Sequence, residues 1–200
     1  MITEKYTSGL ISQSFWFIET KKILSLIREG KTKSEIEEIC INENIFGVTK
    51  EYRAKRILGY IWRRIKRMDD ELIEIFHSSN LETQKLIILI AILFGDRLFF
   101  EFIYDVYREK IILGERCVSI ADLNVFFKKK EDEYEEIAKW SEGTKKRLRA
   151  VYTNYMIDAN LIAEIDNKKI ITPPIIDMSL VRYLKLSNNG VIIKAITGVN

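Results

Sequence analysis

The chain has 200 residues, 47% of them hydrophobic and 30% charged, and its formal net charge is only +3. This composition is typical of a folded globular protein, and it excludes a disordered chain or one that is basic throughout. The longest apolar run, residues 86–94, is far shorter than the about 20 residues that a membrane-spanning helix needs, so it predicts a buried helix.

The chain is poor in proline and rich in helix formers, which predicts a compact all-α domain of several helices. The only two prolines are adjacent, at Pro173 and Pro174. In chain order we expect helices over about residues 12–29, a short helix from 32, then 50–68, 69–78, 80–94, 96–112, 119–131, 141–160 and a final turn or two in 177–186.

Several helix starts carry capping residues. Thr32 and Glu35 have the spacing of a capping box, in which each side chain bonds to the backbone of the other. Thr49 is expected to cap the helix over residues 50–68, and Asn80 and Ser119 are expected to cap two later helices.

After residue 160 the pattern changes to an alternating one around a polar "DNKK", which predicts a small β-hairpin over residues 161–172. We expect one globular domain, with an alternative of two lobes: residues 1–114 with the basic helix, and 115–200 with the hairpin. A helix followed by a hairpin is typical of a winged helix and also of a helical domain with an added hairpin. The sequence leaves both open, and with them a DNA-contacting role for the hairpin.

The positive charge is concentrated in "YRAKRILGYIWRRIKRM", residues 52–68, which hold seven cations and no acid. On a helical wheel of about 100° per residue, one arc is apolar and faces the core. It contains Ala54, Ile57, Leu58, Ile61, Ile65 and Met68. The opposite side carries the cations, with Tyr60 among them. They are Arg53, Lys55, Arg56, Arg63, Arg64, Lys66 and Arg67.

Two features favour a polyanion-binding surface over an ordinary solvated face. Like charges four residues apart repel, and exposed helices usually intersperse acids for that reason. Five of the seven cations are arginine, whose planar guanidinium can grip a phosphate with two parallel donors. From these residues alone, binding and solvation are about equally supported.

A second basic cluster lies near the start of the helix expected over residues 141–160. It consists of Lys145, Lys146, Arg147 and Arg149. These side chains could bind nucleic acid, or they could pair with the acids of the nearby "EDEYEE".

Enzymatic chemistry is not indicated. His77 is the only histidine, so a conventional histidine-based triad or multi-histidine metal site is excluded. No nucleotide-binding, nucleophile-elbow or zinc-protease motif is present, and we expect no cofactor and no metal. Cys40 and Cys117 lie far apart and are expected to be buried thiols, which fits a reducing cytoplasm.

Three segments together resemble the BrxA family, a helical component of BREX bacteriophage-defence systems with a NusB-like fold. They are the opening residues 7–46, then "YRAKRILGYIWRRI", then "SEGTKKRLRAVYTNYMIDANLI"; the later "ITPPIID" belongs to the same pattern. The resemblance is spread over nearly the whole chain in family order. The opening "SFWFIET" is more aromatic than the family pattern.

The resemblance implies a cytoplasmic, non-enzymatic protein that binds DNA beside other BREX proteins, including a methyltransferase and an ATPase. The interrupted apolar run at residues 86–107 argues against a membrane protein. The family's basic helix corresponds to Arg53, Lys55, Arg56, Arg63 and Arg64, whereas Lys66 and Arg67 are added from the wheel. The partner is expected to be duplex DNA bound with low sequence specificity. The alternative is an assembly adaptor or RNA-binding protein that docks an acidic partner through the same surface.

Overall fold

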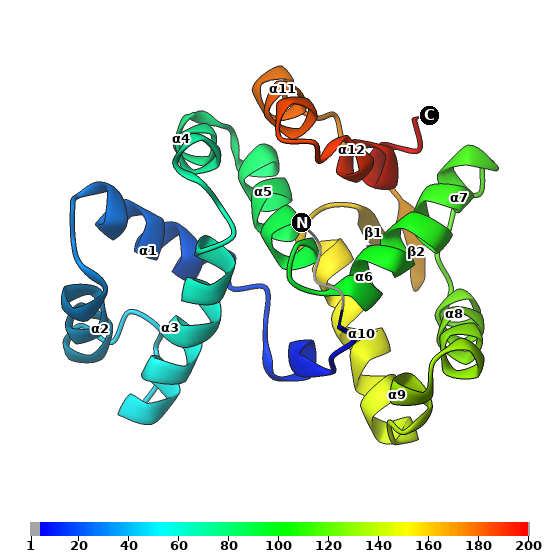
Figure 1. The fold of residues 1–200 in the computed structure, drawn as a ribbon, viewed down its shortest axis with the longest axis horizontal. Coiled ribbons are helices and arrows are strands. Elements are labelled where there is room, and N and C mark those ends of the chain that lie inside the picture. Colours follow the sequence, from blue (N-terminus) through cyan, green and yellow to red (C-terminus); the bar gives the residue numbers. More distant parts are fainter. Residues whose placement is uncertain (1–4, 200) are drawn as a thin grey trace.

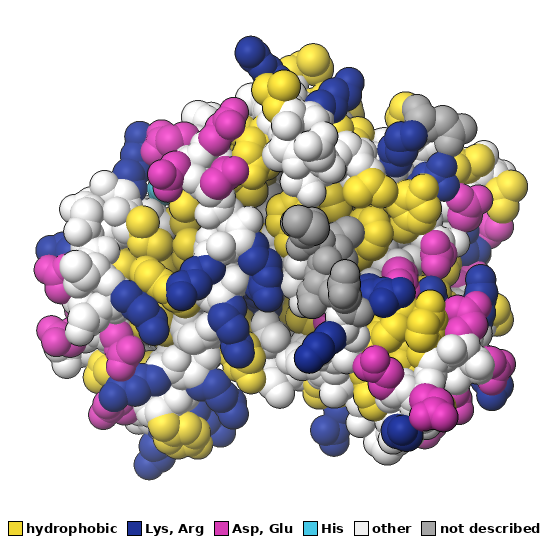
Figure 2. Space-filling view, viewed as in Figure 1, with side chains coloured by type: hydrophobic (Ala, Val, Ile, Leu, Met, Phe, Trp, Pro, Cys, Tyr) yellow, Lys and Arg dark blue, Asp and Glu magenta, His cyan; other side chains and the backbone are white. Residues whose placement is uncertain are grey.

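The computed structural model describes residues 5–199 and is mostly helical, with one antiparallel hairpin near the C-terminus. Figure 1 shows α1–α3 gathered on one side, α5 and α10 in the middle, and α8 and α9 on the other side. Basic, acidic and apolar side chains are mixed over much of the face in Figure 2. The helices are α1 Phe17–Arg28, α2 Lys33–Asn42, α3 Glu51–Ile65, α4 Asp70–Ser78, α5 Leu81–Leu93, α6 Arg97–Phe102, α7 Arg108–Ile112, α8 Ile120–Glu133, α9 Glu135–Ala138, α10 Glu142–Asp158, α11 Met178–Leu186 and α12 Gly190–Thr197.

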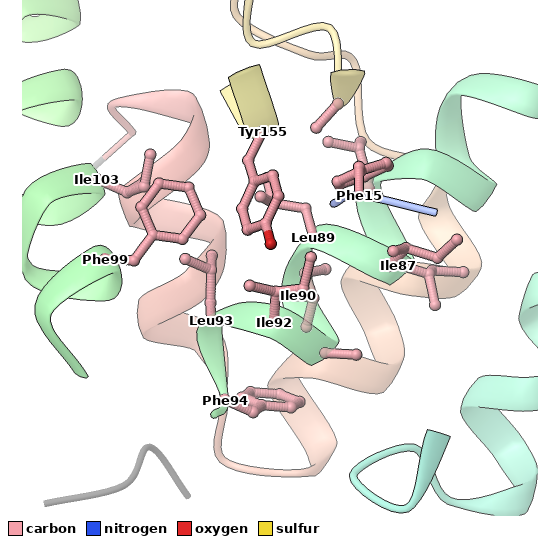
Figure 3. Packing of buried hydrophobic residues seen from close by; sticks show 14 of the residues in the cluster. Phe15, Ile87, Leu89, Ile90, Ile92, Leu93, Phe94, Phe99, Ile103 and Tyr155 are labelled. Atoms are coloured by element: carbon pink, nitrogen blue, oxygen red, sulfur yellow. The ribbon is translucent and has the colours of Figure 1, made fainter. Parts of the chain in front are cut away.

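Helix α5 forms the centre of the core. Every residue from Leu86 to Leu93 is buried, so this helix has no solvent-facing side along that stretch. Its side chains pack beside Phe15, Phe99 and Tyr155, which come from three other parts of the chain (Figure 3). The predicted buried helix is therefore confirmed. In the described part of the chain no helix is both long and apolar enough to span a bilayer.

A π-helical segment, Ile103–Tyr107, lies between α6 and α7. The sequence predicted one unbroken helix over residues 96–112. The predicted extent is right, but over residues 103–107 the backbone hydrogen bonds span five residues instead of four. The Tyr107 hydroxyl, buried in the core, donates to the Leu161 carbonyl at 2.9 Å. Helix α12 contacts both the π-helical segment and α7, so the end of the chain packs against its middle.

Residues 5–16 form an extended segment, with a short 3-10 turn at Gly9–Ser12, that we call the N-terminal strap. The Tyr6 ring packs against Tyr134 with centroids 4.7 Å apart, and its hydroxyl donates to the Glu101 carboxylate at 3.0 Å. The strap also contacts α10 before the chain crosses to α1 (Figure 1). The expected helix start at residue 12 is wrong, because the chain stays non-helical through Trp16, which has a left-handed φ of 52°.

Most of the predicted caps are present. Thr32 forms the full capping box with Glu35, and Asn80 and Ser119 each accept a hydrogen bond from a backbone N–H of the following turn. The expected Thr49 cap is wrong. The N-cap of α3 is Lys50, whose side chain makes no capping bond, so α3 begins without a side-chain cap.

The predicted hairpin is confirmed as strands β1 (Ile162–Ile165) and β2 (Lys168–Ile171). Ile162 is paired with Ile171 and Ile165 with Lys168. The two turn residues, Asp166 and Asn167, both have positive φ, as a two-residue type I′ turn requires. The opposite edge of β2 is bridged by residues 116–118, with Cys117 opposite Ile170. The division into lobes at residue 114 stays a prediction.

Candidate nucleic-acid interface

Helix α3 has one face in the core and one in solvent. Ala54, Leu58, Ile61 and Ile65 are buried, and Met68 is buried just beyond the helix end. The helix contacts α1, α2 and α5 through this apolar stripe. The sequence-based assignment of the core face is therefore correct, and only Ile57 is left half-buried.

Six of the seven predicted cations are exposed, and we call them the basic ridge. Figure 2 shows dark blue side chains crowded over the region of α3. The half-buried Tyr60 lies on the same stretch of chain. The ridge consists of Arg53, Lys55, Arg56, Arg63, Lys66 and Arg67.

The seventh cation, Arg64, does not face solvent, which corrects the sequence-based prediction. Its side chain is 2% exposed and reaches under the N-terminal strap. One guanidinium nitrogen donates to the Phe15 carbonyl at 2.7 Å, and the other donates to the Ser14 carbonyl at 2.8 Å and to Gln13 Oε1 at 3.1 Å. The same nitrogen donates to the Tyr155 hydroxyl at 3.2 Å. Arg64 therefore fixes the strap to α3 and α10, and it is not available to a phosphate.

The rings of Trp16 and Tyr60 lie between the buried Arg64 and the ridge cation Arg63. Trp16 and Tyr60 stack with ring centroids 5.8 Å apart and an interplanar angle of 20°. The Arg63 guanidinium lies 4.6 Å from the Tyr60 centroid, and the Arg64 guanidinium lies 5.4 Å from the Trp16 centroid. Such cation–π contacts hold a guanidinium in place without neutralising it. Trp16 was not among the predicted site residues, and only its place in the aromatic "SFWFIET" marked it.

The ridge is neutralised at one position. Lys55 pairs with Glu51 at 2.7 Å and with Glu37 at 3.6 Å, and the hydrogen bond that it donates to Glu51 is the main cause of its raised pKa. Among the described residues, none of the other five ridge cations forms an ion pair with a carboxylate. Within residues 5–199, five positive charges of the ridge are thus not neutralised by a carboxylate.

Beside the ridge lies a groove of about 490 Å³ between α3 and the N-terminal strap. Its cationic lining includes Lys5, Arg63 and Arg67. The Arg67 guanidinium packs directly over Gly95, where a Cβ atom would collide with it. Desolvation and the neighbouring Arg63 lower the pKa of Arg67, although an arginine stays charged at neutral pH.

A family model for BrxA matches residues 4–188 of the chain. The chain belongs to the BrxA family. A curated relative, the BREX protein BrxA of Bacillus cereus (strain H3081.97), is 33% identical over 199 residues, which is 99% of this chain and 100% of the relative. The sequence-based family resemblance is confirmed, while its comparison with NusB-like folds stays a prediction.

A solved structure shares the fold of this BrxA-family chain. It is that of an uncharacterized protein from Magnetospirillum magneticum, with a TM-score of 0.80. The match covers 97% of this chain and 99% of that one at 17% sequence identity, so it supports the arrangement of the helices alone.

In this BrxA-family protein two of the four cations of the second basic cluster, residues 145–149, form ion pairs. Lys145 is buried and pairs with Glu131 at 2.8 Å, so it cannot reach a phosphate, which corrects the prediction for that residue. Arg149 pairs with Glu142. Lys146 and Arg147 are exposed, and neither forms an ion pair with another described residue. The alternative of pairing with the acids of "EDEYEE" therefore holds for Lys145 alone, since the partner of Arg149 lies outside that segment.

The remaining reactive side chains of this BrxA-family protein are separate from one another. His77 lies in the last turn of α4, edge-on to Phe76, with ring centroids 5.8 Å apart. Both cysteines are free; Cys40 is buried, and burial raises the pKa of its thiol to about 11. Cys117 is half-buried, not fully buried as expected. Within residues 5–199 no three His, Cys, Asp or Glu side chains are grouped as metal ligands.

Proposed function

We propose that this protein is a non-enzymatic, DNA-binding accessory component of a BREX-type bacteriophage-defence system. It acts in the cytoplasm together with other BREX proteins. Membership of the BrxA family supports the defence role. The observation that supports DNA as the ligand is the basic ridge, in which five exposed cations have no carboxylate partner among the described residues.

The geometry of the ridge suits a duplex backbone. At about 1.5 Å per residue, residues 53–67 span roughly 20 Å, which is the length of several phosphates along one strand. Phosphate contacts position a protein on DNA without reading the sequence. The anchor through Arg64 holds α3 against the core, so the ridge is presented on a fixed element. Binding with little sequence preference follows.

The test is a fluorescence anisotropy titration with a 20-base-pair duplex at several salt concentrations. If about four cations contact phosphates, the slope of log K on log salt is about −3.6. Raising salt from about 50 to about 200 mM then weakens binding about 150-fold. The double variant Arg56→Glu/Arg63→Glu is expected to abolish measurable binding at the higher salt.

A matched control reverses two exposed cations on α11, in Arg182→Glu/Lys185→Glu. This variant has the same net charge as the ridge variant, and it is expected to bind DNA close to the parent. If both double variants weaken binding equally, net charge explains the effect and the ridge is not the interface. If RNA of equal length binds much more tightly than the duplex, or an acidic partner protein binds the ridge and DNA fails to displace it, the adaptor or RNA-binding alternative replaces this proposal.

A further inference from the structure

A second cavity lies in the other half of the molecule, between α8, α10 and the hairpin. Its volume is about 470 Å³, within the range of roughly 300–1,000 Å³ that is common for binding sites. The floor of the cavity is apolar. It is lined by Val118, Leu123 and Ile162, each of which is at most 4% exposed. This site shares no lining residue with the groove beside the basic ridge.

The mouth of the cavity is positively charged. Lys146 and Arg149 approach it from α10 and Lys169 from β2, and no acidic residue lines it. Arg149 and Lys169 are each paired with one glutamate outside the lining. No ion pair or hydrogen bond joins the Lys146 side chain to any residue that the structure describes. The site therefore combines an apolar floor with at least one unneutralised cation at its edge.

The apolar surface continues beyond the cavity along α8. Ile120, at the edge of the cavity, is 75% exposed, and Val125, one and a half turns further, is 71% exposed. Asn124 lines both the cavity and a shallow depression next to it. The depression also includes Val125 and two lysine–carboxylate pairs, Lys128 with Asp132 and Lys129 with Glu133. An occupant that covers both is elongated along α8, which favours a stretch of polypeptide over a compact small molecule.

We propose that this groove binds a peptide segment of another protein, in which a bulky apolar residue fills the cavity and adjacent acidic residues meet Lys146 and its neighbouring cations. Exposed apolar side chains rimmed by charge are typical of protein-binding surfaces. The apolar floor offers nothing to a phosphate backbone, so the groove is a site for a protein and the basic ridge a site for DNA. The inference does not depend on DNA binding.

The experiment pans a displayed random dodecapeptide library against the full-length protein. Ala150→Trp is the blocking variant, because Ala150 lines the cavity, is exposed, and can carry a larger side chain that fills it. The recovered peptides are expected to share one Leu, Phe or Trp with Asp or Glu close by. A fluorescein-labelled representative is then expected to lose at least about tenfold in affinity on Ala150→Trp and about tenfold on Lys146→Glu.

Arg147→Glu is the matched control, because it makes the same charge change at the next position of α10 but does not line the cavity. It is expected to leave peptide affinity within about twofold. Thermal melts of all three variants verify that each is folded. The proposal is overturned if no peptide family is enriched, if enriched peptides lack acids and ignore Lys146→Glu, or if the Ala150→Trp change instead abolishes self-association of the chain.

Discussion

The Arg64 guanidinium donates a 2.7 Å hydrogen bond to the carbonyl of Phe15, 49 residues earlier in the chain, in a site closed to solvent. Arg64 also donates to the Ser14 carbonyl and to the Tyr155 hydroxyl. These bonds make Arg64 a structural anchor, whereas the other cations of the helix are exposed. Substitutions at Arg64 should therefore lower the stability of the protein, whereas substitutions at the exposed cations of the same helix should lower its affinity for DNA.

Arg64→Met is expected to lower the free energy of unfolding by about 2–4 kcal/mol, because buried carbonyls would lose their charged donor. Urea denaturation monitored by circular dichroism measures this. Arg64→Lys should restore only part of the loss, since an ammonium cannot reproduce the planar fork. The control, Arg63→Met, is expected to change stability by no more than about 0.5 kcal/mol while weakening DNA binding. Equal stability of the Arg64 and Arg63 variants would contradict the anchor.

Neighbouring ridge cations are expected to differ in what they contribute to DNA affinity. Lys55 is already paired with Glu51 and Glu37, whereas Arg56 forms no ion pair with a described residue. Arg56→Ala should therefore reduce the magnitude of the salt slope by about 0.9, and Lys55→Ala should reduce it less. Anisotropy titrations of both variants check this. A larger loss for the lysine variant would show that DNA displaces its glutamate partners.

Asp96 should make the stability of the protein depend on pH. It is 2% exposed, and burial raises the pKa of its carboxyl to about 7, against about 4 in an unfolded chain. Between these values the folded state holds a proton that the unfolded state has released. The free energy of unfolding therefore falls as pH rises from about 4 to about 7, by up to about 1.4 kcal/mol per pH unit from this group.

Asp96→Asn is expected to remove that dependence. The amide oxygen can still accept the capping bond from the Phe99 N–H, which Asp96 Oδ1 accepts at 2.9 Å. Unfolding free energies measured at pH 5, 6, 7 and 8 should fall for the parent and stay flatter for the variant. Parallel curves for the two proteins would show that the carboxyl is not titrating in this range.

The start of α2 depends on one hydroxyl. Thr32 Oγ1 accepts from the Glu35 N–H at 3.3 Å, and the Glu35 carboxylate accepts from the Thr32 N–H at 2.7 Å. Thr32→Ala should cost about 1 kcal/mol of stability, and Thr32→Ser should cost much less because it keeps the acceptor. Thermal melts compare the three proteins. Equal melting temperatures for parent and alanine variant would show that the box is already frayed in solution.

Much of the fold was predictable because local patterns determined it. The apolar stripe of α3, the unbroken apolar run of α5 and the "DN" turn of the hairpin each follow from a period or a turn residue. The capping box at Thr32 is equally local. Helix α12 was missed, since its short apolar sequence is helical only through packing on the π-helical segment and α7.

The candidate site was predictable in composition but not in detail. A helical wheel separates the cations from the core, yet it assigned Arg64 to the solvent side, because it cannot show that a distant segment covers one end of a helix. Lys145 is a different case, because it is buried and pairs with Glu131, one of the nearby acids that the sequence had offered as partners. The error at Arg64 comes from contacts between residues far apart in sequence.

The N-terminal strap also sets an order of events during synthesis. The Gln13 carbonyl accepts its bond from the Tyr155 hydroxyl, 142 residues later, and Arg64 shares the same hydroxyl. Gln13 therefore lacks this partner until α10 has been synthesised. Until then Arg64 can hold the strap only through Gln13, Ser14 and Phe15, so the native packing of this segment is completed late, by a contact of high sequence separation.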